Sequence, residues 1–354
     1  MTQGRPLVGL TLGDPSGVGP EIVVRALADP SLRTTLRGLV VGDAQTVRRA
    51  VAGCELELEV RCVEGPEDVT GATGVVEVLD LGNVGHVEFG VVDPACGRAA
   101  VESIEETCRL ALDGRIDTIV TAPINKEALR ASGSRHPGHT EMFADLLGTP
   151  PGEVMTMFVL DRLRIFFLTR HLSLVDAIAQ LDVETVTAGL HRTDELLRAL
   201  GFAAPRIALA ALNPHAGEHG LMGREDDELL RPAVEALRAA GVDVRGPVPA
   251  DSVFWQCRQG SHDGVLSLYH DQGHVAAKTV SFFGVVSVTL GLPVIRTAAE
   301  HGTAFDIAGR WIADAAGQIG ALRTAAELTL SARAGGPGRP GAGETVRGTS
   351  PRCR

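Results

Sequence analysis

Short runs of Val, Ile and Leu alternate along the chain with longer segments whose apolar residues recur every three or four positions. Several of the short runs are continuously apolar, which is typical of strands buried on both faces. These runs are residues 7–12, 38–43, 117–123, 163–169, 206–212 and 265–269. Residues 97–114 and 184–200 have helical periodicity instead. The alternation predicts an α/β protein whose strands are largely parallel.

The length of the chain bounds its domain organisation. A chain of 354 residues is too long for one ordinary core, so two domains are expected. Aromatic residues make up only 4% of the sequence, and Val, Leu, Ile and Ala must therefore fill most of the interior. Residues 335–354 are rich in Gly and Pro, basic and without periodicity, which predicts a disordered tail.

The charge balance excludes some classes of partner. A net charge of −11 argues against nucleic-acid or anionic-membrane binding, because either would need a basic face. An anionic ligand would then depend on a few local Lys, Arg or metal groups. No window approaches the ~18 apolar residues of a membrane span, and residues 7–12 are too short for a signal peptide. The six cysteines contain no C-x-x-C pair, which suits reduced thiols in a cytoplasmic protein.

Three of the apolar runs end in histidine, at His171, His215 and His270. In parallel α/β sheets, ligands bind beyond the carboxyl ends of the strands. Three imidazoles at one such edge would form a His₃ site for a divalent cation, with positions open for water or substrate. Each histidine could instead end its strand and bond to a neighbouring loop. The pattern leaves both interpretations open.

A fourth histidine, His139, lies in the motif HPGHTE, directly before an apparent helix that begins MFADLLG. Thr140 is expected to cap this helix, and the exposed amides of its first turn favour an anion. His274 and His301 border other polar clusters, where a supporting role stays open.

A glycine-rich loop near the start, LTLGDPSGVGPEI, has the outline of a phosphate cradle between a strand and a helix. It lacks the G-x-G-x-x-G fingerprint of dinucleotide sites and the Lys-Ser/Thr of the Walker motif. A tight turn without a ligand explains the glycines equally well. Asp14 and Glu21 are possible site carboxylates, although their spacing does not require it.

Eight motifs in this order resemble the 4-hydroxythreonine-4-phosphate dehydrogenase family across residues 7–330. They are GDPSGVGPE, TAPINKEAL, HPGHTE, LNPHAGEHGLMGRE, PADS, YHDQGH, LGLPVIRT and EHGTAFDIAGR. The resemblance implies the isocitrate/isopropylmalate dehydrogenase-like fold, with two α/β/α domains, a cleft between them and an obligate homodimer. Residues 1–132 and 286–332 would form the first domain. Residues 133–285 would form the central domain, with the metal ligands and the dimer interface.

The resemblance also assigns roles to individual residues. It implies that His171, His215 and His270 bind one divalent ion (Zn, Mg or Co), and that substrate contacts come from His139, Thr140, Lys278 and Arg296. Metal ligands reach the site from the partner subunit in this family, so each site would be composite. The family usually has Asn as a further substrate contact where this chain has Ser287. This departure leaves the identity of the substrate open.

The implied reaction oxidises the secondary alcohol of 4-phosphooxy-L-threonine with NAD or NADP. The β-keto acid formed would decarboxylate to 3-amino-2-oxopropyl phosphate, a step in pyridoxal 5′-phosphate biosynthesis. A chelated metal would lower the pKa of the alcohol, while Lys278 and Arg296 would offset the charge of the phosphate and carboxylate. Asp271 is a candidate either to orient the imidazole of His270 or to cap a loop. The sequence reveals neither a general base nor a short cofactor motif.

Several other functions fit the same motifs. The nearest is a paralogue that oxidises 4-phospho-D-threonate or 4-phospho-D-erythronate, and Ser287 keeps this alternative open. A more distant member would oxidise a cyclic dihydrodiol carboxylate. A phosphate acyltransferase shares the fold but needs no His₃ metal site, so tightly bound metal would argue against it. A non-catalytic metal or metabolite binder would bind ligand without reducing NAD.

Overall fold

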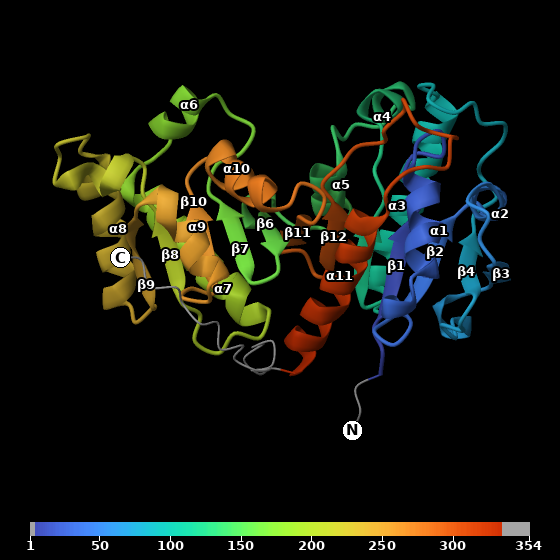
Figure 1. Ribbon diagram of the computed structural model, residues 1–354, viewed down its shortest axis with the longest axis horizontal. Helices are drawn as coiled ribbons and strands as arrows, with labels where there is room; N and C mark the ends of the chain where they lie inside the picture. Colours follow the sequence, from blue (N-terminus) through green and yellow to red (C-terminus); the bar gives the residue numbers. More distant parts are fainter. Residues whose placement is uncertain (1–3, 335–354) are drawn as a thin grey trace, which may run out of the picture.

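The computed structural model describes residues 4–334 of the chain, and within them all strands belong to one twelve-stranded sheet (Figure 1). The order across the sheet is β3-β4-β2-β1-β5-β12-β11-β6-β7-β10-β8-β9. The strands are β1 (Leu7–Thr11), β2 (Arg37–Gly42), β3 (Glu59–Val63), β4 (Val75–Asp80), β5 (Thr118–Thr121), β6 (Met155–Leu160), β7 (Leu163–Phe167), β8 (Ile207–Ala210), β9 (Val244–Val248), β10 (Gly264–Ser267), β11 (Val286–Leu290) and β12 (Ile295–Ala299).

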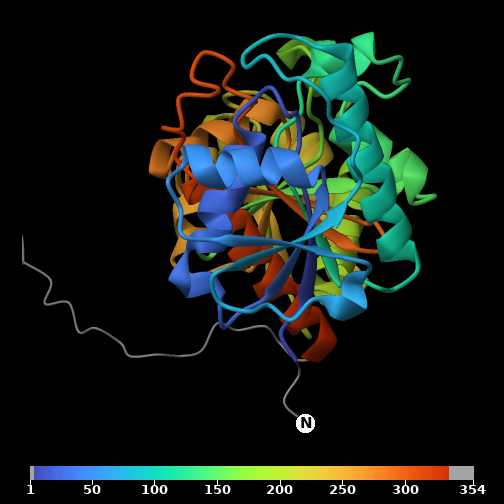
Figure 2. The same cartoon turned by 90° about the vertical axis from the view of Figure 1, so that its right-hand side faces the viewer.

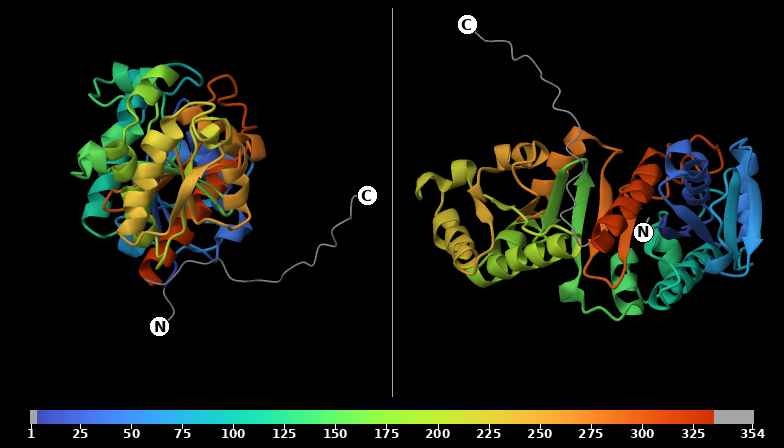
Figure 3. Two further views of the ribbon diagram at one scale, coloured as in Figure 1. Left: turned by 90° about the vertical axis from the view of Figure 1, so that its left-hand side faces the viewer. Right: turned by 90° about the horizontal axis from the view of Figure 1, so that it is seen from below.

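Helices cover both faces of this sheet. They are α1 (Gly19–Ala28), α2 (Ala44–Gly53), α3 (Pro94–Leu112), α4 (Lys126–Ala131), α5 (His139–Leu146), α6 (Leu174–Ala179), α7 (Val183–Ala199), α8 (Arg231–Ala239), α9 (Ala250–Arg258), α10 (His270–Val280) and α11 (Ala316–Ala334). In one half of the molecule α3 lies on one face and α1, α2 and α11 on the other (Figure 2). In the other half α9 and α10 lie opposite α7 and α8 (Figure 3).

The prediction of an α/β protein with largely parallel strands is confirmed. All six predicted runs contain a strand, and the two predicted helices are α3 and α7. The exceptions to parallel pairing lie at the middle of the sheet, where β11 runs antiparallel to β12 and β6, and β6 antiparallel to β7. Two parallel halves are therefore joined by an antiparallel centre.

The chain enters one half of the sheet twice. Strand β12 pairs in parallel with β5, which brings Ile295 opposite Thr118. The blue and red ends of the chain consequently share the right-hand half in Figure 1, and the green to orange middle forms the left-hand half. The predicted boundaries at residues 132 and 286 remain a prediction. The predicted tail, residues 335–354, lies outside the described residues.

Local sequence signals account for where several helices begin. Asp43 caps α2 by accepting a hydrogen bond from the Thr46 amide at 2.6 Å. Asn125 caps α4 through the amides of Glu127 and Ala128, at 2.9 Å each. In α1 a proline stands in the first turn, where its missing N–H leaves no helical hydrogen bond unmade.

The interior is filled by aliphatic side chains, as the low aromatic content requires. Strands β1, β5, β8, β10 and β11 are buried along their whole length, and their residues are aliphatic apart from glycine, Ser and Thr. The cysteines within residues 4–334 are free thiols, whereas Cys353 lies beyond that part. Among these residues, no helix combines the length and the hydropathy that a membrane crossing would need.

Candidate active site

A cavity of about 690 Å³ opens at the centre of the sheet, between its two halves. Its walls come from the end of β5, the segment after β7, the start of α5, one face of α10, and strands β6, β11 and β12. Seven of the nine residues that the family resemblance and its implied reaction assign to the site line it: His139, Thr140, His171, His270, Lys278, Ser287 and Arg296. Asp271 and His215 are not in the wall.

Arg296, on β12, is the most deeply buried charge of the cavity, at 5% exposed. Its Nη2 donates to the Thr121 hydroxyl at 2.5 Å, and its Nη1 is 3.2 Å from the Thr289 hydroxyl. The guanidinium carbon lies 5.5 Å from the centre of the Phe143 ring. Burial lowers the pKa of Arg296 to about 10, so it stays charged at neutral pH. No carboxylate within residues 4–334 forms an ion pair with it, which leaves its charge available to an anion.

Three further cations face the same space. Lys278, on α10, is 3.8 Å from the Glu300 carboxylate, beyond hydrogen-bond distance. Arg170, after β7, donates to the Thr156 hydroxyl, and burial lowers its pKa. Lys126 opens α4 and lines the cavity as well. Against these four cations the wall has two carboxylates, Glu141 and Glu300, so positive charge is in excess.

His139 was expected directly before the helix and is instead the first residue of α5, and the predicted cap is wrong. The capping position is Gly138, and no side chain accepts a hydrogen bond there. Thr140 lies inside the first turn, so its hydroxyl is free to face the cavity it lines. Burial, and then the positive charges of Arg296 and Lys126, hold the pKa of His139 well below its usual range. Its Nε2 is buried without a partner among residues 4–334.

Ser287 lies on β11 directly opposite Phe158 of β6, and it is 8% exposed. Its short side chain contributes to the cavity wall at the joint between the two halves of the sheet. An amide at this position would reach farther into the cavity than the hydroxyl does.

The three candidate metal ligands follow neighbouring strands. His171 follows β7, His270 follows β10 and His215 follows β8, and these strands are adjacent in the sheet. Such neighbours are ~4.8 Å apart. The rings of His171 and His270 are 5.8 Å apart between centroids. Burial, and then the charge of Arg170, lower the pKa of His171, which favours the neutral imidazole that a metal requires.

His215 is separated from this pair although its strand is close. It is exposed, with φ of 52°, in a loop where Ala216, Glu218 and His219 also have left-handed backbones. Among residues 4–334 no three His, Cys, Asp or Glu side chains lie close enough to hold a metal ion. A single chain therefore brings two of the three predicted ligands together.

Asp271 contacts the imidazole beside it. Its Oδ1 is 2.6 Å from Nδ1 of His270, while most of its carboxylate is exposed. This contact would leave Nε2 of His270 free to bind a metal ion. Metal-binding histidines commonly have their other ring nitrogen hydrogen-bonded to a carboxylate in this way. The predicted orienting role therefore has a geometric basis, and it stays a prediction.

Sequence reasoning did not assign His274, which lies beside His270 in the cavity wall. The two rings stack at 3.5 Å, and the His274 ring also packs against Phe158 and Phe167, at 4.3 and 4.6 Å. Burial lowers the pKa of His274 to about 4. The signal that could have found it is spacing, because residues 270, 274 and 278 share one face of a helix.

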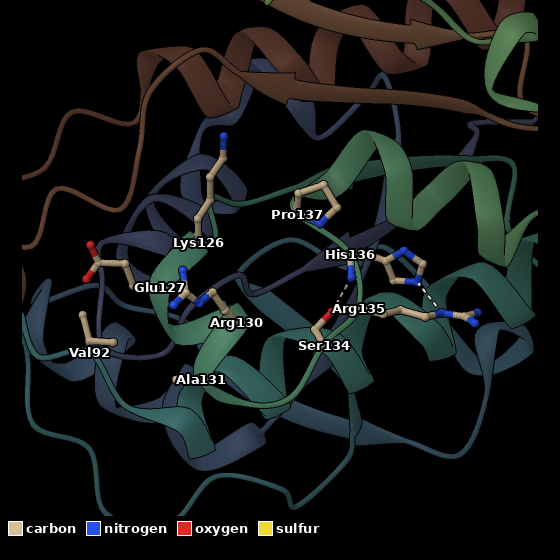
Figure 4. A pocket seen from close by; sticks show the side chains of 9 residues that line it. All are labelled: Val92, Lys126, Glu127, Arg130, Ala131, Ser134, Arg135, His136 and Pro137. Atoms are coloured by element: carbon tan, nitrogen blue, oxygen red, sulfur yellow. Dashed lines mark hydrogen bonds between the residues drawn. The ribbon is translucent and has the colours of Figure 1, made fainter.

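A second cavity of about 880 Å³ shares Lys126 and Pro137 with the first (Figure 4). Arg135 and His136 lie on the loop after α4, and both are close to the Asp145 carboxylate, at 2.5 and 3.4 Å. Lys126 and Arg130 form no ion pair within the described part of the chain. This hollow continues the positive charge of the candidate site outward.

The glycine-rich loop is explained by close packing rather than by the cavity. Gly13 has φ of 69°, and a Cβ there would lie 2.2 Å from the Pro123 carbonyl oxygen. Asp14 accepts hydrogen bonds from the amide and hydroxyl of Ser16, and burial raises its pKa. Glu21 accepts from the Ala313 amide at 2.7 Å. Neither carboxylate lines the candidate site.

The sheet and its cavity define an α/β protein with a cationic site, and comparison with known proteins shows that its family is one of dehydrogenases. The chain belongs to the pyridoxal phosphate biosynthetic protein PdxA family, whose model matches residues 34–325. The predicted resemblance is thereby confirmed, and the fold is isocitrate dehydrogenase-like.

Similar proteins carry two different names. The D-threonate 4-phosphate dehydrogenase of Cupriavidus necator is 45% identical over 330 residues, which cover 93% of this chain and 98% of the relative. A putative D-threonate 4-phosphate dehydrogenase of Cutibacterium acnes is 46% identical, over 91% of this chain and 94% of the relative. The crystal structure of 4-hydroxythreonine-4-phosphate dehydrogenase from Klebsiella pneumoniae is 39% identical, with a TM-score of 0.84, and covers 92% of this chain and 100% of that chain.

Proposed function

We propose that the protein oxidises 4-phospho-D-threonate at its C3 hydroxyl with NAD or NADP as hydride acceptor. The hydride passes to the nicotinamide and a proton leaves the hydroxyl. The resulting β-keto acid loses its carboxylate as carbon dioxide, which leaves a phosphorylated dihydroxyketone. The 4-phospho-D-erythronate epimer is the second substrate of this type.

The observation that carries this proposal is the excess of positive charge in the cavity. Lys126, Arg170, Lys278 and Arg296 face two carboxylates, so the space suits a phosphate together with a carboxylate. The C2 hydroxyl of the threonate adds no charge. The relatives named D-threonate 4-phosphate dehydrogenase support the same choice.

The second candidate is 4-phosphooxy-L-threonine, the substrate implied first by the sequence motifs. It carries an ammonium at C2, which would have to be buried among four cations. Glu141 and Glu300 are the two carboxylates that could partner it. The similar Klebsiella pneumoniae protein, named 4-hydroxythreonine-4-phosphate dehydrogenase, supports this second candidate.

The residues of the chain would act by holding the substrate. Arg296, held by two threonine hydroxyls, would bind an acidic group in a fixed orientation, and Lys278 would bind the other end as a point charge. Neutral His139 and the hydroxyl of Thr140 would add hydrogen bonds at the start of α5. Such fixed contacts would hold the reacting carbon in position for hydride transfer to the nicotinamide.

A divalent metal fits the kind and the strand positions of the three histidines, although only His171 and His270 are close together in one chain. His171 and His270 would hold it, with His215 as the third ligand. Such an ion would stabilise the alkoxide from which hydride leaves. The third imidazole and the composite site would both come from a homodimer, which is part of the same proposal.

The test is a substrate panel. Purified protein, a divalent metal and NAD or NADP are mixed with 4-phospho-D-threonate, 4-phospho-D-erythronate or 4-phosphooxy-L-threonine, and absorbance of the reduced nicotinamide is followed. Reduction with the hydroxy acids supports the proposal. Reduction with the amino acid alone would replace it by the second candidate, and no reduction with any of the three would reject both.

A further inference from the structure

One face of α10 runs along the candidate site and contributes three residues to its wall. They are His270, His274 and Lys278, spaced four residues apart. At 1.5 Å of rise per residue, the distance from the first to the last is about 12 Å along the helix axis. A substrate that reaches from His270 to Lys278 must therefore pass His274.

The hydrogen bond that His274 makes within its helix fixes its tautomer. Nδ1 lies 2.8 Å from the carbonyl oxygen of His270. A carbonyl can only accept, so Nδ1 carries the proton and donates it. In the neutral ring Nε2 is then an acceptor with a bare lone pair.

Neighbouring rings fix the orientation of this acceptor. The imidazole is stacked on His270 at an interplanar angle of 12° and is packed against Phe158 and Phe167. The ring therefore cannot turn without displacing side chains of β6 and β7. Nε2 has no hydrogen-bond partner within residues 4–334 and His274 lines the cavity, so this acceptor is available to a ligand there. A rigid acceptor there is complementary to a donor on the substrate.

We propose that His274 positions the substrate by accepting a hydrogen bond from its C2 hydroxyl at Nε2. This inference rests on the proposed function, because the C3 hydroxyl is the group oxidised and C2 carries the remaining hydroxyl of a 4-phosphorylated threonate. An ammonium at C2 could also donate to Nε2, so the contact requires a donor at C2 and does not depend on its charge.

The experiment compares two ligands that differ only at C2. They are 4-phospho-D-threonate and its 2-deoxy analogue with the same C3 configuration. Dissociation constants are measured by calorimetry in the presence of divalent metal and without nicotinamide, in the wild type and in two variants. His274→Phe keeps a flat ring between Phe158 and Phe167 but has no acceptor, and His274→Gln restores an acceptor oxygen. Thr279→Ala, on the exposed side of α10, is the control.

The wild type and Thr279→Ala are expected to bind the hydroxy acid roughly tenfold more tightly than the deoxy analogue. In His274→Phe this ratio should fall to near one, and His274→Gln should recover part of it. Metal content, measured on each variant, should stay equal to that of the wild type. If His274→Phe does not fold, His274→Leu replaces it.

A ratio that is the same in the wild type and in His274→Phe would overturn the inference, including the case in which both ligands lose affinity equally. A structural role for the ring predicts that equal loss. Turnover separates this result from a failure of the proposed function. A wild type that shows the ratio but reduces no nicotinamide with 4-phospho-D-threonate would reject that function and still support the role of His274.

Discussion

The two ends of the candidate site are built differently. At one end Arg296 is enclosed between strands, held by two threonine hydroxyls and packed on Phe143. At the other end His171 and His270 are neighbours, but His215 stands exposed on a loop with left-handed backbone. The surroundings of Arg296 come from one chain, whereas the three predicted metal ligands do not come together in it. Strand pairing fixes the position of Arg296. A third metal ligand depends on the position of the loop that carries His215.

The largest expected effect tests the end of the site that holds Arg296. Arg296→Met should lower kcat/KM by roughly 100-fold or more, because it removes a buried charge that no carboxylate of residues 4–334 pairs with. The unfolding free energy should stay equal or rise, since a buried cation without a carboxylate is itself unfavourable. Steady-state kinetics and urea denaturation measure the two effects.

Arg164→Met is the matched control. Arg164 is another guanidinium over an aromatic ring, 4.9 Å from Phe202, and burial lowers its pKa, but it lies outside the cavity. Its kcat/KM should equal that of the wild type. Equal losses of activity in the two variants would contradict the assignment of Arg296.

The second effect tests the end of the site that holds the predicted metal ligands. His215→Ala should weaken metal retention by roughly tenfold or more and abolish turnover, because a ligand is lost. The thermal midpoint of the metal-free protein should not change, since the side chain is exposed. Metal content after dialysis measures retention. His219→Ala, on the same loop with the same backbone conformation, is the control. Full metal retention in His215→Ala would remove it from the site.

A smaller effect is expected at the joint between the two ends. Ser287→Asn restores the residue usual in the family and places an amide in the cavity beside Phe158. The ratio of kcat/KM for 4-phosphooxy-L-threonine to that for 4-phospho-D-threonate should rise by about tenfold, the effect of one polar contact. Ser287→Ala should leave the ratio near that of the wild type. If Asn and Ala give the same ratio, position 287 does not select the substrate.

The smallest effect is on stability against pH. The folded protein holds the pKa of His139 well below 6.5, so below that pH the unfolded chain binds a proton that the folded chain does not. The contribution of neutral His139 to the unfolding free energy is therefore fully present above pH 6.5 and is lost as the pH falls below it. Between pH 6.5 and 5.5 the unfolding free energy of the wild type should fall by about 1 kcal/mol more than that of His139→Gln. Urea denaturation of both proteins at pH 6.5 and 5.5 measures this difference. An equal loss of stability in the two proteins would contradict a neutral His139.

The fold could be predicted from the sequence because strands and helices are marked by the pattern of apolar residues within each short segment. Continuous apolar runs marked β1, β5, β7, β8 and β10, and histidines after three of the runs pointed to one sheet edge. The partners of Arg296 could not be found in this way. Thr121 lies 175 residues away and Thr289 on the neighbouring strand, and only the pairing of β12 with β5 and β11 brings them together.

The errors and omissions have equally specific causes. Thr140 was expected to cap α5, but the extended backbone at Gly138 starts the helix earlier. His274 was left unassigned because helix α10 was not predicted, so the common face of residues 270, 274 and 278 was not visible. The approach of His215 to His171 and His270 was expected because each follows an apolar run, but the left-handed loop after β8 keeps it apart from them within one chain.

The antiparallel centre of the sheet has a consequence for motion. Because β6 and β11 are hydrogen-bonded to each other and to both halves, the halves are not separate bodies swinging on a tether. Closing over a substrate must bend or twist these two strands. Ser287 and Phe158 lie on these strands and in the cavity wall, so bending the strands would also move that part of the wall. A stiffer pairing there would slow closure and alter recognition together.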